Sequence, residues 1–172
     1  ADASALMVLE SADASDESML APIDSADVVY LTGGDPSHLL ETLRGSLLLL
    51  RLVRALDRGH ILAGSSAGAM VMGSWMRRRG WQDALGVVDG VTVLPHHERS
   101  DPEKVARELA EEEPPSGVVL GIDAMSCWFG SQDGGKVLGS GGVTVYSGSD
   151  WRRHVSGDTL SLVSVEKKGL TP

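Results

Sequence analysis

The hexapeptide Gly64-Ser65-Ser66-Ala67-Gly68-Ala69 directly follows the apolar run Ile61-Leu62-Ala63. An apolar run that stops at small residues and continues into an Ala/Met-rich segment predicts a strand, a sharp turn and a helix. The Gly-x-Ser-x-Gly core puts Ser66 at the apex of that turn, as in a nucleophile elbow. Ala67 would then begin the helix, where backbone N–H groups lack intrahelical partners and can bind a developing oxyanion. The alternative is a Gly/Ser-rich loop that packs against a helix.

A second glycine turn lies earlier in the chain, at Gly33-Gly34. It ends the β-branched and aromatic run 27–32, which predicts a strand. Asp35-Pro36 follows, with a side-chain acceptor for the helix N-cap and a proline at the first helical position. Leucines at helical spacing then continue to Leu56, with a possible break at Gly45. The turn is therefore expected at the ligand-binding edge of a sheet, although a tight connection without catalytic duty would have the same pattern.

The remaining pattern predicts an α/β fold with a mostly parallel sheet flanked by helices and antiparallel strands added at the C-terminal end. Residues 76–90 lack a clean period and are expected to form a loop with one or two short strands. The other expected strands are 5–9, 91–94, 118–123, 125–130, 136–138, 143–146 and 159–165, and the other expected helices are 67–75 and 101–113, besides a poor helix around 18–20.

Composition narrows the function classes. The 172 residues fit one domain, 1–172, and with 42% apolar residues no run approaches the ~20 apolar residues that span a bilayer. A net charge of −9 disfavours nucleic acid and anionic membranes as partners. The N-terminus is acidic rather than basic, so no signal peptide is expected, and the single cysteine suits a reducing compartment. A cytoplasmic location is therefore expected. The basic run Arg77-Arg78-Arg79 is expected to be a solvated loop.

Polar residues end four of the expected strands, and parallel strands share one carboxyl edge. These residues match the catalytic roles of a serine hydrolase. Ser66 would be the nucleophile, His96 the general base, and Asp123 the acid that orients the base. The N–H groups of Gly34 and Ala67 would form the oxyanion hole.

Other residues leave alternatives open. His97 could replace His96 as the base, and the order Ser66, Asp123, His154 would match an α/β-hydrolase, although His154 is expected in a loop. A zinc site at the paired histidines is disfavoured, because adjacent residues in an extended segment point in opposite directions. Cys127 is expected to be a small buried hydrophobe, and the remaining histidines, His38 and His60, to be structural.

The Gly33-Gly34-Asp35 turn, the hexapeptide at 64–69, Pro95-His96 and Gly121-Ile122-Asp123 together resemble the peptidase E (aspartyl dipeptidase) and cyanophycinase family of serine peptidases. The similarity covers roughly residues 26–142. It implies a fold like that of the class I glutamine amidotransferases and the same roles for Ser66, His96, Gly34 and Ala67.

The chain departs from that family at several positions. Asp35 stands where the family often has Asn, His97 where it usually has an aromatic residue, and Asp123 is the nearest acid where the family often has Glu, so another carboxylate could orient the base. Arg99 is the nearest cation for an N-terminal aspartate of a substrate, although pairing with a neighbouring acid would also explain it. Asp35, Arg99 and His97 are thus the expected substrate contacts.

The expected activity is that of a serine exopeptidase, a dipeptidase or aminopeptidase, which hydrolyses short peptides through an acyl-enzyme on Ser66. No metal or organic cofactor is implied, and a homodimer is expected from the resemblance alone. Two other functions remain open. One is a cyanophycinase-like hydrolase of β-linked aspartyl-arginine chains, and the other is a catalytically silent relative that binds a small ligand.

Overall fold

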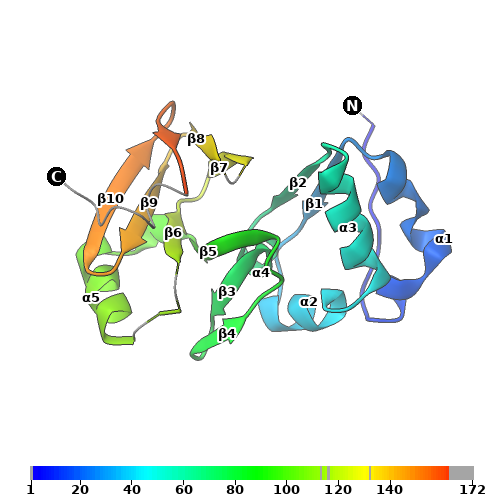
Figure 1. Ribbon diagram of the computed structural model, residues 1–172, viewed down its shortest axis with the longest axis horizontal. Coiled ribbons are helices and arrows are strands. Elements are labelled where there is room, and N and C mark those ends of the chain that lie inside the picture. The colour runs from blue at the N-terminus through cyan, green and yellow to red at the C-terminus, as the bar shows by residue number, and fades with distance from the viewer. Residues whose placement is uncertain (1, 113, 116, 132, 163–172) are drawn as a thin grey trace. The chain divides into compact units, whose positions relative to one another are not determined.

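The computed structural model describes residues 2–112, 114–115, 117–131 and 133–162. Its internal contacts divide the chain into two compact units, Ala1–Val71 and Met72–Pro172, which we call unit 1 and unit 2 and describe in turn (Figure 1). The expectation of a single domain over residues 1–172 stays a prediction. No helix in the described part of the chain combines the length and apolar character needed to cross a bilayer.

Unit 1 is built around a two-stranded parallel sheet. Strands β1 (Val28–Leu31) and β2 (Ile61–Gly64) pair from Val28↔Ile61 to Leu31↔Gly64. Helices α1 (Glu17–Leu20), α2 (Pro36–Leu43) and α3 (Leu47–Asp57), with the short 3-10 turns η1 (Asp13–Ser15) and η2 (Ala21–Ser25), complete the unit. The buried apolar residues that hold it together include Leu20, Ile23, Leu40, Leu43, Leu48, Leu52 and Ala55.

The leucine-rich segment forms two helices, as the possible break at Gly45 indicated. Arg44 is extended, Gly45 has a φ of 70°, and the Ser46 hydroxyl accepts a hydrogen bond from the Leu49 N–H at 3.1 Å. A side-chain acceptor at the N-cap satisfies an amide that the new helix leaves unpaired, so the second helix begins here. The strand expected at 5–9 is wrong: residues 2–9 have no regular structure, and Met7 and Leu9 are exposed.

Helix α4 (Ala67–Met72) leads from unit 1 into unit 2 and is shorter than the expected helix 67–75. Gly73 begins strand β3 (Gly73–Arg77) instead, at a point where a Cβ would overlap the carbonyl of Val91 on the neighbouring strand. Glycine is a poor helix former and allows this close approach of two strands. The helix therefore ends where the backbone must join a sheet.

Unit 2 has a six-stranded mixed sheet in the order β10-β9-β6-β5-β3-β4. Strands β3, β5 and β6 are parallel to one another, whereas β4, β9 and β10 pair antiparallel. The expected mostly parallel sheet is therefore corrected to a mixed one, with antiparallel strands on both flanks. The new elements are β4 (Trp81–Asp83), β5 (Val88–Pro95), β6 (Val118–Ile122), β9 (Gly142–Ser147), β10 (Asp150–Val155) and helix α5 (Pro102–Glu112).

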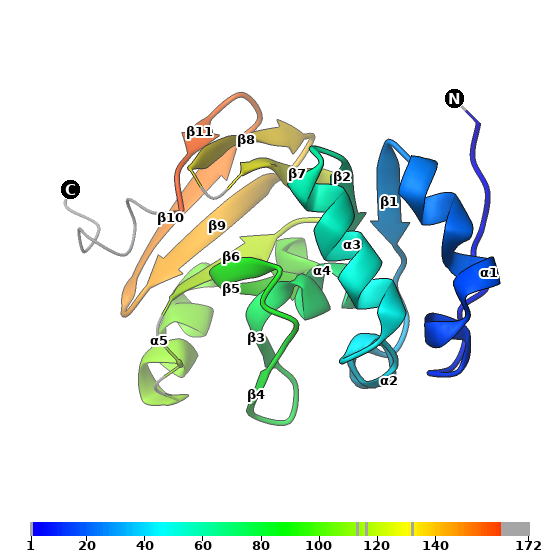
Figure 2. The same ribbon diagram turned by 45° about the vertical axis from the view of Figure 1, so that its right-hand side comes forward.

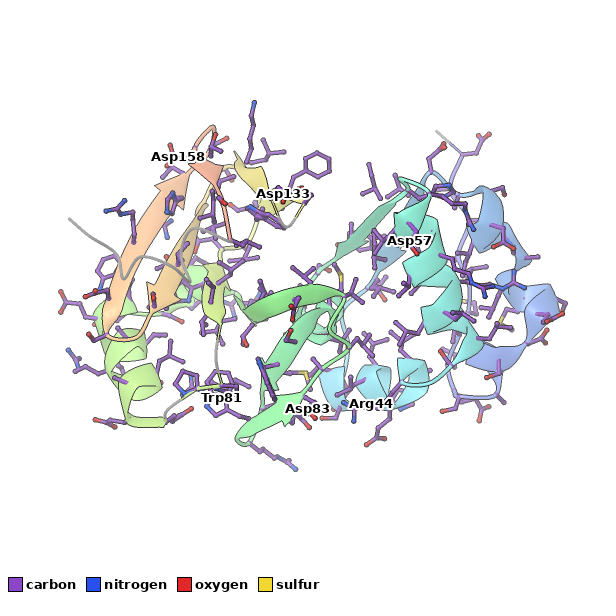
Figure 3. All side chains as sticks on the ribbon, in the orientation of Figure 1. Arg44, Asp57, Trp81, Asp83, Asp133 and Asp158 are labelled. Atoms are coloured by element: carbon purple, nitrogen blue, oxygen red, sulfur yellow. The ribbon has the colours of Figure 1, made fainter. Side chains whose placement is uncertain are left out.

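Helix α5 packs its apolar side on this sheet. Val105, Ala106 and Leu109 of the helix form one buried cluster with Val119 of β6 and Tyr146 of β9. The partly buried side chains Trp81 and Leu94 pack against the same cluster, and Trp81 is labelled in Figure 3. The cluster fixes β6 and β9, and with them the strand ends that carry the polar residues of unit 2.

A three-stranded antiparallel sheet, ordered β11-β8-β7, completes unit 2 (Figure 2). Its strands are β7 (Ser126–Ser131), β8 (Gly134–Gly139) and β11 (Thr159–Leu160). Antiparallel C-terminal strands are thus confirmed. The last one, expected at 159–165, is a strand only at Thr159–Leu160: residues 161–162 lie outside it, and 163–165 lie outside the described residues. Cys127 is exposed on β7, which corrects its expected burial: strand alternation turns it away from its half-buried neighbours Ser126 and Trp128.

Candidate functional site

Ser66 lies in unit 1 on a sharp turn between β2 and α4. Its φ of 49° is in the left-handed region, a backbone conformation that residues other than glycine rarely adopt. A Cβ on Gly64 would lie 2.7 Å from the Gly68 carbonyl carbon, and one on Gly68 would lie 2.8 Å from the Leu31 Cβ and overlap the Leu31 carbonyl. Both positions therefore require glycine. The Leu31 carbonyl also accepts a hydrogen bond from the Ser65 N–H at 3.1 Å, which ties the turn to β1.

The Gly33-Gly34 turn lies against the same serine. A Cβ on Gly33 would be 3.3 Å from the Ser66 Cβ and 3.7 Å from its Oγ, and Gly34 has a φ of 146°. The structure thus brings together Ser66, Ala67 at the start of α4, and the Gly34 turn. Asp35 has the predicted N-cap role: its Oδ1 accepts hydrogen bonds from the N–H groups of Ser37 at 2.8 Å and His38 at 3.1 Å.

Unit 2 carries the two candidate bases at the end of β5. His96 has a φ of 57° and precedes the 3-10 turn η3 (His97–Arg99). The described part of the chain has four non-glycine residues with positive φ, namely Ser66, Arg79, His96 and Met125. Two of the four are the predicted nucleophile and base. Such conformations cost of order 1–3 kcal/mol each and are frequent at functional sites.

His97 is a core residue with 2% of its surface exposed. Its Nε2 lies 2.7 Å from the Tyr146 hydroxyl, and a Cβ on Gly121 would lie 2.5 Å from its ring. Burial lowers the pKa of His97, chiefly by desolvation of the charged ring. The predicted substrate contact of His97 is therefore corrected, because a buried, packed imidazole cannot reach a substrate.

Asp123 is buried at the end of β6, with 3% of its side chain exposed. Its Oδ2 accepts a hydrogen bond from the Gly142 N–H at 3.0 Å and forms a short ion pair with Arg153 of β10. Its Oδ1 is buried without a partner among the described residues. No hydrogen bond thus joins Asp123 to a histidine within the described part of unit 2, and the carboxylate is held by Arg153 instead.

Glu98 and Arg99 follow the candidate base on the turn η3. The Glu98 Oε2 accepts a hydrogen bond from the Ala124 N–H at 2.8 Å, and its Oε1 lies 3.4 Å from the Arg99 Nε. The Ala124 bond is the largest cause that lowers the pKa of Glu98, and the charges of Arg99 and His96 add to it. Arg99 is 81% exposed and lies beside the acidic side chain of Glu98. Its contact with a substrate stays a prediction.

Sequence reasoning missed Glu98 and Arg153. Glu98 was visible as an acid two residues after a candidate base. Arg153 had no comparable signal, because it reaches Asp123 from 30 residues away on a strand that the pattern did not predict.

The remaining histidines do not compete for the site. His154 lies on β10, not in a loop, and its Nδ1 is 3.9 Å from Asp158, which Figure 3 labels. Since consecutive strand residues point to opposite faces, His154 faces away from the Arg153–Asp123 pair, which disfavours the order Ser66, Asp123, His154. The Nε2 of His38 donates a hydrogen bond to the Leu9 carbonyl oxygen at 2.8 Å, as a structural histidine would. Within the described residues, no group of three or more His, Cys, Asp or Glu side chains could hold a metal ion.

Comparison with known proteins gives the family. The model of peptidase family S51 matches residues 3–133. Cyanophycinases from Synechococcus elongatus (31% identity over 160 residues) and Trichormus variabilis (32% over 141 residues) match 84% and 73% of this chain. These matches cover 49% and 46% of the two relatives, so the chain spans about half the length of the cyanophycinases it matches.

A solved structure is also similar. The crystal structure of a peptidase from an acI-B1 Actinobacterium superposes with a TM-score of 0.78 at 26% identity, and the match covers 91% of this chain and 68% of that one. The sequence match and the fold therefore agree with the motifs at residues 33–35 and 64–69. The chain belongs to peptidase family S51, the family of peptidase E and the cyanophycinases.

Proposed function

We propose that this chain carries the catalytic residues of a serine-type hydrolase that cleaves amide bonds in short peptides. Ser66 is the nucleophile on a nucleophile elbow, His96 is the general base, and the N–H groups of Gly34 and Ala67 bind the oxyanion. The observation that carries the proposal is the left-handed Ser66 on a glycine-enclosed turn, with the Gly33-Gly34 turn 3.3 Å from its Cβ.

The chemistry follows the acyl-enzyme scheme. The Ser66 oxygen attacks the substrate carbonyl carbon while His96 takes the hydroxyl proton, and His96 then returns that proton to the leaving amine. Water attacks the acyl-enzyme in the second half and releases the acid and free Ser66. The proposal requires the Ser66 Oγ and the His96 ring to meet at about 2.6–3.2 Å during catalysis. His96 is preferred over His97 because His97 is buried against Tyr146.

The proposed substrates are short peptides, with an N-terminal aspartate as the first class to test, and Asp35 and Arg99 as candidate contacts. A second candidate function is hydrolysis of β-linked aspartyl-arginine chains. It is supported by the match to cyanophycinases and by the net charge of −9, which attracts arginine. A basic run at Arg77-Arg78-Arg79 would disfavour a substrate that carries arginine. Arg77 is engaged by acids, however: its Nε donates to Glu112 at 2.8 Å and its Nη2 to Glu108 at 3.2 Å.

A covalent label tests the mechanism. Phenylmethylsulfonyl fluoride should sulfonylate Ser66 with loss of fluoride, abolish hydrolysis, and be located on the 64–69 peptide by mass mapping. Ser66→Ala should lower kcat by about 10⁴- to 10⁶-fold and prevent labelling. Ser65→Ala is the matched control, because Ser65 is the exposed neighbour on the same turn. Hydrolysis that persists in Ser66→Ala would overturn the assignment.

A direct comparison of candidate substrates distinguishes the two proposed activities. Purified protein is given Asp-X dipeptides, matched Asn-X dipeptides and cyanophycin, and the released amines are quantified. Cleavage of Asp-X alone supports the dipeptidase, and cleavage of cyanophycin alone supports the second candidate. Turnover of neither, together with an unlabelled Ser66, would favour the catalytically silent, ligand-binding alternative.

A further inference from the structure

Groups other than His96 hold one oxygen of the Asp123 carboxylate, and its other oxygen accepts no hydrogen bond from His96 within the described residues. Its Oδ2 is shared between the Gly142 N–H and the Arg153 guanidinium, and its Oδ1 is buried without a partner among the described residues. A carboxylate that orients a catalytic base accepts a hydrogen bond from that base. Asp123 instead acts as the anchor of an ion pair that joins β6 to β10.

Glu98 is a second carboxylate at the same strand ends. His96 follows the last residue of β5 and Ala124 lies two residues beyond β6, and the two strands pair at Pro95↔Ile122. The 2.8 Å hydrogen bond from the Ala124 N–H to the Glu98 Oε2 therefore links the ends of neighbouring parallel strands. It fixes one oxygen of Glu98 two residues after His96 in the chain.

The electrostatic surroundings are consistent with this arrangement. The charged groups at this edge include Glu98 and Arg99 on the turn η3, Asp123 at the end of β6, and Arg153 on β10. The hydrogen bond from the Ala124 N–H is the largest cause that lowers the pKa of Glu98, and the positive charges of Arg99 and His96 lower it further. Glu98 thus stays ionised around neutral pH.

We propose that Glu98, and not Asp123, is the positioning carboxylate that orients the His96 ring and stabilises its protonated form. This inference rests on the proposed role of His96 as general base. Glu98 does not touch the substrate: it acts through His96, as the acid of a serine-hydrolase triad does. The Ala124 N–H holds the carboxylate in place, and its negative charge favours the imidazolium that forms when His96 takes the Ser66 proton.

The substitution Glu98→Gln tests the negative charge of Glu98 separately from its structural hydrogen bond. The amide oxygen can still accept the Ala124 hydrogen bond, so the turn is retained while the charge is lost. We expect kcat to fall by about 10²- to 10⁴-fold with little change in KM. We also expect the acidic limb of the pH profile of kcat/KM to move to lower pH. Glu98→Asp should recover part of kcat, and Glu111→Gln on α5 is the control of equal charge change.

A measurement that does not depend on enzyme turnover tests the role of Glu98 separately from the proposed function. The ring resonances of His96, assigned with His96→Gln, are titrated by NMR in the wild type, Glu98→Gln and Asp123→Asn. We expect Glu98→Gln to perturb the pH dependence of the His96 ring resonances more than Asp123→Asn does. The opposite ranking, or no shift in Glu98→Gln, overturns the inference even if Ser66 is labelled and active. An unlabelled, inactive wild type would overturn the proposed function instead, and with it the role of Glu98 in catalysis.

Discussion

The Tyr146 hydroxyl lies 2.7 Å from Nε2 of His97, and the two rings meet edge to face with centroids 5.5 Å apart. Both side chains are buried, with 1% and 2% of their surfaces exposed. Burial also raises the pKa of Tyr146, so the phenol keeps its proton over the whole neutral range. This pair fixes the turn after β5, and with it the backbone at His96.

Tyr146→Phe should destabilise the protein without changing its fold. The substitution leaves a buried ring nitrogen of His97 without a hydrogen-bond partner, which costs about 1–3 kcal/mol. Urea unfolding at pH 8 measures the loss of unfolding free energy. Tyr30→Phe is the control, because Tyr30 is exposed on β1 and its hydroxyl should contribute little. Equal effects of the two variants would contradict the role of the pair.

The stability of the protein should fall as pH drops through the titration range of an unfolded histidine. His97 has a lowered pKa in the folded state, so below about pH 6.5 the unfolded chain binds a proton that the folded one does not. Unfolding free energy should therefore decrease from pH 7 toward the lowered folded pKa. His97→Gln should reduce this slope, and His38→Gln, which alters an exposed histidine, is the control for the substitution itself. A slope that His97→Gln leaves intact would assign the effect to other groups.

Arg153 and Asp123 should show strong coupling in a double-mutant cycle. Arg153→Gln leaves the buried Asp123 carboxylate without its cation, a change that costs about 3–5 kcal/mol when fully buried. Arg153 is 42% exposed, so water offsets part of this and we expect a loss of about 1–3 kcal/mol. The double variant Asp123→Asn/Arg153→Gln should be more stable than the sum of the single variants predicts. Additive losses would show that the pair does not interact.

Gly68→Ala should destabilise the Ser66 turn. The added methyl would overlap the Leu31 carbonyl and lie 2.8 Å from the Leu31 Cβ, so β1 and α4 would have to separate. Overpacking of this kind costs about 1–3 kcal/mol, and activity should fall with it. Gly45→Ala is the matched control: it has no atom within 4 Å and carries only the strain of its φ of 70°, about 1 kcal/mol. Activity should be retained in Gly45→Ala, and its loss there would contradict a local effect at Ser66.

The sequence predicts a structural feature best where that feature depends on a single short segment of the chain. The Gly-x-Ser-x-Gly turn, the N-cap at Asp35 and the central strands β5 and β6 depend on residues a few positions apart, so local pattern predicts them. The sequence alone does not distinguish His96 from His97 as the candidate base, because the difference lies in their tertiary contacts. Only the packing of His97 against Tyr146, 49 residues away, identifies it as a core residue.

Long-range pairing explains what local pattern missed. Strand β10 is almost wholly exposed, with two arginines at its centre, so no hydrophobic alternation marks it. It forms because it pairs residue by residue with β9, from Asp150↔Ser147 to Val155↔Gly142. The Arg153–Asp123 ion pair depends on that pairing, which is why the engagement of Asp123 could not be read from its own neighbourhood in the chain.

The exposed thiol on β7 matters for how this protein is handled at the bench. Cys127 is the only cysteine of the chain, so oxidation during storage can join two molecules by a disulfide but cannot form a bridge within one. A gel or scattering experiment without reductant would then display a covalent pair that reports air oxidation rather than native assembly. The same thiol offers one defined attachment point for a maleimide dye, with no engineered cysteine needed.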